Sequence, residues 1–151
     1  MKIALGADHA GYKIKQMIKK HLLKLGHKIE DFGTASTQSV DYPDFAFKVA
    51  ESVAKGENEK GILFCWTANG MCISANKVKG IRAAVCLNED MAILSREHND
   101  ANVLCLSSKF IPEDKVISIV EVWLRTEFGG ERHQRRVDKI KEYEQEKEKG
   151  R

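Results

Sequence analysis

The 151-residue sequence predicts a single α/β domain in which a five-stranded parallel sheet is covered by helices on both faces. Two observations support this prediction. Five short apolar segments recur along the chain, and segments with helical periodicity separate them. Strands that alternate with helices are joined by right-handed crossovers, which makes the strands parallel. A chain of this length buries roughly 68–70% of its unfolded surface, so one ordinary core suffices.

The expected strands are short and are bounded by polar or small residues. The last three are apolar without interruption, so we expect them to be buried on both faces of the sheet. The strand segments are KIALG (2–6), KIEDFG (28–33), GILFC (61–65), RAAVC (82–86) and NVLCL (102–106).

The expected helices have apolar residues three and four positions apart and recognisable ends. The first stops before Gly26, a residue type common just past a helix. Pro43 suits the first turn of the second, and Asn88 can cap the third. The last has a narrow apolar stripe, so we expect it to pack at its start and fray at its end. The helical segments are residues 12–25, 43–56, 88–99, 112–128 and about 131–148.

Composition excludes several classes of protein. The chain is 42% hydrophobic and 31% charged with two prolines, unlike disordered, collagenous or disulfide-scaffold proteins. The net charge of +3 is small, and basic residues alternate with acidic ones outside RHQRR (132–136), so no nucleic-acid binding is expected. The N-terminal apolar run is too short for a signal peptide, and no segment is long enough to span a membrane. We expect a soluble cytoplasmic protein.

The four cysteines do not have the spacing of a zinc site, so no metal is expected. Cys72, Cys86 and Cys105 are interpreted as small buried hydrophobic residues in a reducing compartment. Cys65 differs because it ends a strand and precedes a short loop that opens a helix. Helix N-termini and loop amides can stabilise a thiolate, but a buried inert cysteine is the alternative interpretation. The loop Trp66–Gly70 resembles an oxyanion loop only weakly, since it has a single glycine.

Ligands of open parallel sheets bind beyond the carboxyl ends of the strands. Asp8 and His9 follow the first strand there, where they could orient a hydroxyl group or exchange its proton. Alternatively, Asp8 only caps the next helix and His9 is solvated. His98 and Asn99 end a helix, and Arg132 and Arg136 share one helical face, which suits a phosphate group. A solvated charged face is the alternative for the two arginines.

Five ordered blocks together resemble the ribose-5-phosphate isomerase B family, which also includes galactose-6-phosphate isomerase subunits. The resemblance runs from Met1 to about Tyr143. The blocks are GADHAGYKIK, DFGT…SVDYPDFA, C-x-T-x-x-G…ISANKVKGIRAAVC, SREHNDANVL and GERHQRRVDKI.

This resemblance implies a Rossmann-like three-layer α/β/α sandwich that isomerises an aldose phosphate to a ketose phosphate without a metal or other cofactor. It implies active sites shared across a homodimer, with a tetramer also possible, and a C-terminal helix that packs on a partner subunit. Cys65 would be the base that forms an enediolate, which Thr67 and the loop amides would stabilise. His98, with Asp8, would open the sugar ring. The substrate-binding residues would be His9, Tyr42, Trp66, Ala68, Asn69, Gly70, Asn99, Lys109, Arg132 and Arg136.

The chain also departs from the family pattern. Trp66 and Ala68 stand where glycines are usual, and a Cβ costs about 1–2 kcal/mol where φ is positive. Lys109 stands where arginine is usual. Lysine keeps the positive charge, but it cannot form the two parallel hydrogen bonds of a guanidinium group. Glu131 stands where glycine is usual. Ribose 5-phosphate is the expected substrate, and the alternatives are a six-carbon or modified sugar phosphate, or a non-catalytic sugar-phosphate-binding subunit. A generic nucleotide-binding domain is less favoured because no glycine fingerprint is present.

Overall fold

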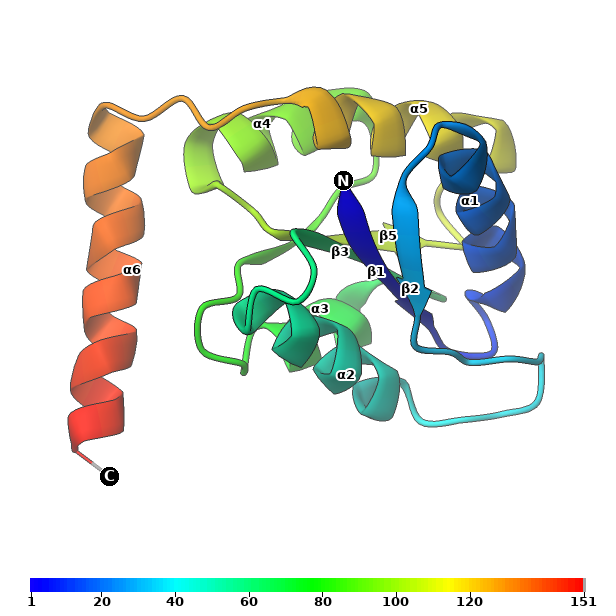
Figure 1. The fold of residues 1–151 in the computed structure, drawn as a ribbon, viewed down its shortest axis with the longest axis horizontal. Coiled ribbons are helices and arrows are strands. Elements are labelled where there is room, and N and C mark those ends of the chain that lie inside the picture. Colours follow the sequence, from blue (N-terminus) through cyan, green and yellow to red (C-terminus); the bar gives the residue numbers. More distant parts are fainter. Residues whose placement is uncertain (151) are drawn as a thin grey trace.

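The computed structural model describes residues 1–150 and has five strands and six helices (Figure 1). The strands are β1 (Lys2–Ala7), β2 (Lys28–Asp31), β3 (Lys60–Cys65), β4 (Ala83–Val85) and β5 (Val103–Ser107). The helices are α1 (Tyr12–Lys24), α2 (Tyr42–Ala54), α3 (Asn69–Ala75), α4 (Glu89–Asn99), α5 (Glu113–Arg125) and α6 (Arg132–Lys149). Arg151 lies outside the described residues.

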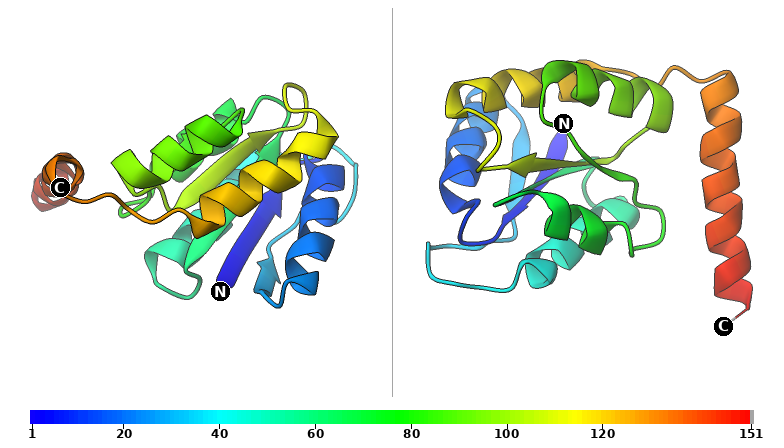
Figure 2. Two further views of the ribbon diagram at one scale, coloured as in Figure 1. Left: turned by 90° about the horizontal axis from the view of Figure 1, so that it is seen from above. Right: turned by 180° about the vertical axis from the view of Figure 1, so that it is seen from behind.

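All strand pairs are parallel, in the order β2-β1-β3-β5-β4. Helices α1, α4 and α5 cover one face of the sheet, and α2 and α3 cover the other (Figures 1 and 2). The predicted three-layer α/β/α sandwich with a five-stranded parallel sheet is therefore confirmed. Strand β2 lies on one side of β1 in the sheet, and the chain then returns to form β3 on the other side of β1. This reversal creates a topological switch point between β1 and β3, where ligands of such sheets bind.

Alternation along the strands divides the core into two layers, because successive side chains point to opposite faces. On one face, Leu5 and Phe64 pack with Trp123 of α5. On the other face, Leu63 and Cys105 pack with α2 and α3. The small residues on these two helices let them lie close to the sheet.

The helix-end predictions are confirmed at three positions. The Asn88 side chain accepts a hydrogen bond from the Met91 amide at 2.8 Å and so caps α4. Gly26 follows α1 with φ of +87°, and Gly56 follows α2 with φ of +77°. Both glycines adopt the left-handed conformation that ends a helix without the Cβ penalty.

Three elements differ from their predictions. The strand expected over residues 82–86 is only three residues long and half-buried, because it forms an edge of the sheet. The helix expected to continue to residue 128 ends at Arg125, after which Thr126 is extended. The second strand ends at Asp31, but the chain stays attached to the sheet. Gly33 accepts a hydrogen bond from the Ala7 amide, and the Thr34 amide donates to the Ala7 carbonyl, each at 2.8 Å.

Helix α6 stands apart from the sandwich in all views (Figures 1 and 2). Val137 is its buried residue. Its later turns reach the loop after α3, where Glu148 pairs with Lys79 and the Glu144 carboxylate accepts a hydrogen bond from the Gly80 amide at 3.2 Å. Such a helix has an apolar stripe that its own chain covers only at one point.

Candidate active site

Cys65 is the last residue of β3 and lies at the switch point of the sheet. It is 4% exposed. The Asp8 amide, just beyond β1, donates to the carbonyl of Phe64 at 3.3 Å. The two strand ends that carry Asp8 and Cys65 are therefore joined directly, as the sequence predicted for the carboxyl edge of the sheet.

Backbone amides surround the Cys65 sulfur, but they do not make it a thiolate. Burial raises the pKa of the Cys65 thiol, and the charge of Asp8 raises it further. The N–H groups of Met71, Ala68 and Thr67 donate to the sulfur and act in the opposite direction. Burial outweighs these donors, so the pKa of the Cys65 thiol lies above its ordinary value.

Ala68 adopts the left-handed conformation, with φ of 74°, whereas Trp66 does not have a positive φ. Ala68 is fully buried and precedes the first turn of α3. Of the two positions where family members usually have glycine, only the second therefore requires the glycine-like backbone. Ala68 therefore carries the strain of a Cβ in the left-handed region. Glu131 also has a positive φ, of 52°, at the entry to α6.

We expect Ala68→Gly to raise the melting temperature by up to about 5 °C, as measured by differential scanning calorimetry. Relief of the left-handed Cβ is worth about 1–2 kcal/mol, and the lost burial of one methyl group costs about 0.8 kcal/mol. Ala50→Gly is the matched control, since Ala50 is buried in α2 with no positive φ. That control should lower the melting temperature, and a similar decrease for Ala68→Gly would contradict the prediction.

Gly70 and Tyr42 bring α3 and α2 into contact beside Cys65. A Cβ at Gly70 would lie 2.1 Å from the Tyr42 ring. Gly70 therefore leaves the space that the tyrosine occupies, and the ring is fixed next to the first turn of α3. Asn69 lies in this turn, and its amide donates to the Thr67 hydroxyl at 3.3 Å.

Asp8, His9 and Tyr42 line one cavity of about 560 Å³ together with residues 40, 41, 43 and 44. Asp8 is 8% exposed, and its carboxylate accepts a hydrogen bond from the Gly11 amide at 3.0 Å. Asp8 therefore fixes the turn before α1, whose N-cap residue is Gly11, and does not cap the helix itself. Its position beside Cys65 also allows a role with a ligand. His9 Nδ1 accepts a hydrogen bond from the Val40 amide at 3.2 Å, which leaves Nε2 to donate.

His98 and Arg132 line a second cavity, of about 630 Å³, between the end of α4 and the start of α6. The His98 ring stacks on His133, with ring centroids 4.2 Å apart. Asn99 ends α4, and its carbonyl accepts a hydrogen bond from Arg82. Arg136 is exposed one turn beyond Arg132 on α6. His98, Asn99, Arg132 and Arg136 are hereafter the His98 half.

The Cys65 half, which comprises Asp8, His9, Tyr42 and residues 65–70, lies at the other end of the sheet. Cys65 is in register with Ser107, at the carboxyl end of β5. Asn102 follows α4 and lies at the amino end of β5. The Asn102 carbonyl accepts a hydrogen bond from the Gly61 amide there. A strand of five residues spans on the order of 15 Å. One chain therefore does not bring the two halves together.

Trp66 follows Cys65 in the loop and is largely exposed. Its side chain is 53% exposed, and the Lys109 Nζ lies 5.3 Å from the centroid of its ring. The Trp66 carbonyl accepts hydrogen bonds from the Ser107 hydroxyl at 2.7 Å and from the Lys109 amide at 3.1 Å. Lys109 therefore lies beside the Cys65 half of its own chain.

Two residues that shape the site were missed from the sequence. His133 lies within the basic cluster, where its stacking on His98 has no signal in the spacing. Partial burial and the nearby His98 lower the pKa of His133, and the adjacent arginines add to this. Ser107 ends β5, and its hydroxyl fixes the backbone of the 66–70 loop. A polar residue at the end of an otherwise apolar strand was the signal that could have identified it.

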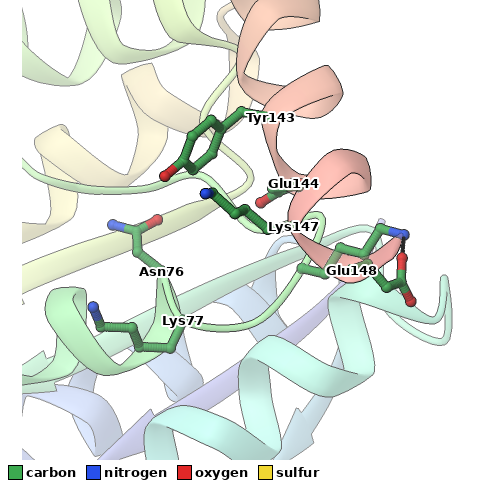
Figure 3. Close-up of a pocket in the computed structure, with 7 residues that line it drawn as sticks. Asn76, Lys77, Tyr143, Glu144, Lys147 and Glu148 are labelled. Atoms are coloured by element: carbon green, nitrogen blue, oxygen red, sulfur yellow. Dashed lines mark hydrogen bonds and ion pairs between the residues drawn. The ribbon is translucent and has the colours of Figure 1, made fainter. Parts of the chain in front are cut away.

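A third cavity, of about 410 Å³, separates α6 from the loop after α3 (Figure 3). It contains none of the predicted site residues. Its lining residues are Asn76, Lys77, Lys79, Tyr143, Glu144, Lys147 and Glu148. Within residues 1–150, three or more His, Cys, Asp or Glu side chains do not gather in a way that could hold a metal ion. No helix in this range has the length and apolar character needed to cross a membrane.

Comparison with known proteins identifies the family. The family model described as Ribose/Galactose Isomerase matches residues 3–140. The chain belongs to this ribose/galactose isomerase family. Ribose-5-phosphate isomerase B of Escherichia coli is 46% identical over 144 residues, which cover 95% of this chain and 97% of that protein. The isomerase family assignment agrees with the five sequence blocks, and the chain is an enzyme of the isomerase class.

Solved structures of the isomerase family have the same fold. A ribose-5-phosphate isomerase B from Clostridium thermocellum superposes with a TM-score of 0.95 at 53% identity, covering 97% of this chain and 99% of that chain. The enzyme from Mycoplasma genitalium, solved with bound ribulose 5-phosphate, gives a TM-score of 0.93 at 46% identity, covering 96% and 97%.

Proposed function

We propose that the protein interconverts ribose 5-phosphate and ribulose 5-phosphate as an aldose–ketose isomerase. The main support is Cys65, held at the switch point with three backbone amides directed at its sulfur. A base next to donors for a developing oxyanion is what abstraction of a proton beside a carbonyl requires. A family member with ribulose 5-phosphate bound supports the choice of sugar.

In the proposed mechanism, Cys65 removes the proton from the carbon next to the carbonyl and returns it to the neighbouring carbon. The C–H electron pair forms the enediolate double bond, and the negative charge moves to oxygen. Amides of the 67–70 loop and the Thr67 hydroxyl stabilise that charge. In this proposal the same amides donate to a substrate oxygen bound beside the sulfur.

The remaining predicted residues receive roles by the same proposal. His98 opens the sugar ring with Asp8, while Tyr42 and Asn99 hold hydroxyl groups. His9 donates from Nε2 to the phosphate, and Arg132 and Arg136 pair with it. Trp66, Ala68, Asn69, Gly70 and Lys109 shape the wall around the sugar.

We further propose that the working unit is a homodimer in which each site combines the Cys65 half of one chain with the His98 half of its partner. The separation of the two halves by the length of the sheet supports this arrangement. So does α6, which carries Arg132 and Arg136 and stands apart from its own sandwich. In this proposal residues 1–151 act as one domain, with α6 serving the partner.

The alternatives are a different sugar phosphate and a non-catalytic subunit. Neither is favoured, because relatives similar over nearly the whole chain are ribose-5-phosphate isomerases. The test is a panel of five- and six-carbon aldose phosphates given to the purified chain alone. We expect the highest kcat/KM for ribose 5-phosphate. A higher value for a six-carbon phosphate would overturn the substrate, and lack of turnover by the chain alone would overturn the activity.

The pH dependence of kcat/KM should reflect the raised pKa of Cys65. A base acts when deprotonated, so its active fraction grows as the pH approaches a pKa that burial has raised above the ordinary value. We expect log kcat/KM to rise continuously from about pH 7.5 to about pH 9, since this constant reports groups of the free enzyme. Steady-state rates with circular dichroism at each pH would measure this. A plateau reached by about pH 7.5 would contradict it.

A cytoplasmic location is also proposed. All four cysteines are unpaired, which is usual where thioredoxin and glutathione keep thiols reduced.

A further inference from the structure

One buried hydroxyl group contacts the loop that carries the proposed oxyanion donors. Ser107 ends β5, is fully buried, and is in register with Cys65 of β3. Its Oγ donates a hydrogen bond to the Trp66 carbonyl at 2.7 Å. The same Oγ accepts hydrogen bonds from the amides of Phe110 at 2.9 Å and Lys109 at 3.2 Å. The proposed mechanism gives this serine no role.

These three hydrogen bonds use the whole capacity of the hydroxyl group. A serine hydroxyl has one proton to donate and two lone pairs that accept. Because the two amides occupy both lone pairs, the proton is directed at the Trp66 carbonyl alone. Ser107 therefore joins the 66–70 loop to the turn at residues 107–110. A side chain without the hydroxyl group would break all three bonds at once.

The bond from Ser107 fixes the direction of the next amide in the loop. The Trp66 carbonyl also accepts a hydrogen bond from the Lys109 amide at 3.1 Å, so two donors hold it in place. A peptide unit is planar and its N–H points opposite to its C=O, so a fixed Trp66 carbonyl also fixes the N–H group of Thr67. Burial raises the pKa of the Cys65 thiol, and this N–H group is one of the donors that oppose the rise.

Side-chain contacts do not hold this part of the loop in the same way. The Trp66 side chain is largely exposed and contacts the exposed Lys109, and such a cation–π contact contributes little at an exposed site. Ala68 is buried, but it has the left-handed conformation. A residue with a Cβ keeps that conformation only where its surroundings determine it. The hydrogen bonds to the Trp66 carbonyl are the contacts that do so on the side of β3.

We propose that Ser107 is a positioning residue of the isomerisation, which holds the amides of the 67–70 loop toward the oxygen that becomes negative in the enediolate. This inference rests on the proposed function and extends it to a buried residue behind the loop. Fixed donors stabilise a transition state because they do not reorient as the charge develops. Loss of the hydroxyl group therefore slows proton transfer. It leaves substrate binding nearly unchanged, since the residues proposed to hold the phosphate lie on other elements.

The test compares Ser107→Ala with Ser52→Ala in the full-length protein. Ser52 is the matched control, because it is buried and its hydroxyl donates to the Val49 carbonyl at 2.8 Å within α2, outside both halves of the site. Steady-state rates are measured with the sugar phosphate of highest kcat/KM, and melting temperatures are measured on the same samples.

We expect Ser107→Ala to lower kcat at least about tenfold and to keep KM within about threefold, the pattern of an interaction made in the transition state. Outright removal of one oxyanion donor costs about 10²–10³-fold, and here a donor is misdirected rather than removed. Ser52→Ala should keep kcat within about twofold even where its melting temperature falls as far as that of Ser107→Ala.

A second measurement does not depend on the sugar. Protein labelled with ¹⁵N-threonine gives four backbone amide signals, and Thr67→Ser identifies the signal of Thr67 by its loss. We expect Ser107→Ala to shift this signal and to speed hydrogen exchange of the Thr67 amide at least about tenfold, since a loop that loses its anchor opens more often. Ser52→Ala should change neither. This measurement also applies to inactive protein, so a failure of the proposed function is distinguishable from a failure of this inference.

Ser107→Cys, studied with dithiothreitol present, keeps the shape of the side chain and replaces the hydroxyl by a weak donor. It should lower kcat at least about threefold, and it provides the test should the alanine variant not fold. The inference is overturned by a smaller loss of kcat in these Ser107 variants while Cys65→Ala is inactive, by a loss that lies in KM instead of kcat, or by an unchanged Thr67 amide. Full turnover by Cys65→Ala would instead contradict the proposed function.

Discussion

Cys65→Ala is expected to lower kcat by about 10³-fold while leaving the fold intact. A positioned general base contributes typically 10²–10⁴-fold, and Cys65 is the group in the Cys65 half that the proposal assigns to proton transfer. The substitution removes one sulfur atom from a buried position and keeps the β3 backbone, so the melting temperature should change little. Coupled spectrophotometric rates and calorimetry on the same sample measure both quantities.

Cys86→Ala is the matched control for the loss of a buried thiol. Cys86 is also buried at the carboxyl end of its strand region, but it packs on the opposite face of the sheet from Cys65. It should retain the wild-type rate. Turnover by Cys65→Ala at the rate of this control would mean that another group moves the proton.

Mixing two inactive variants should restore activity if each site combines two chains. Cys65→Ala destroys the Cys65 half and His98→Ala destroys the His98 half. In a mixed dimer, one site receives both defects and the other receives none. Random pairing makes half of all dimers mixed, so about a quarter of the wild-type activity should return. The measurement is the rate after the two variants are unfolded, mixed in equal amounts and refolded.

A mixture of His98→Ala with Arg132→Ala is the control, because both substitutions lie in the same half. Every site in that mixture keeps a defect, so its rate should equal that of the separate variants. Recovery in this control, or none in the first mixture, would exclude a site shared in the proposed way. Size-exclusion chromatography confirms that pairing occurs in each sample.

The order of the elements could be predicted from the sequence because the relevant signals are local. The apolar runs that became β1, β3 and β5 are almost unbroken, and Asn88 and Gly26 mark helix ends by side-chain and backbone chemistry alone. Burial of the 82–86 strand was predicted wrongly because composition does not say which strand lies at a sheet edge. That property depends on the order β2-β1-β3-β5-β4, which long-range pairing decides.

The candidate site was only partly accessible from the sequence. The rule that ligands bind at carboxyl strand ends brought Asp8 and Cys65 together correctly. It could not place His98, because α4 carries that residue back to the amino edge. The pKa of Cys65 also required the structure, since burial and amide donors oppose each other and only their geometry decides the balance.

The position of His98 and Cys65 at opposite edges of one sheet also separates folding from function. A chain diluted until it is alone would keep both layers of its core and still lack a complete catalytic set. Its specific activity would then follow the law of mass action, rising with protein concentration although every molecule is already folded. The isomerase would thus be regulated by how much of it is present as well as by its substrate.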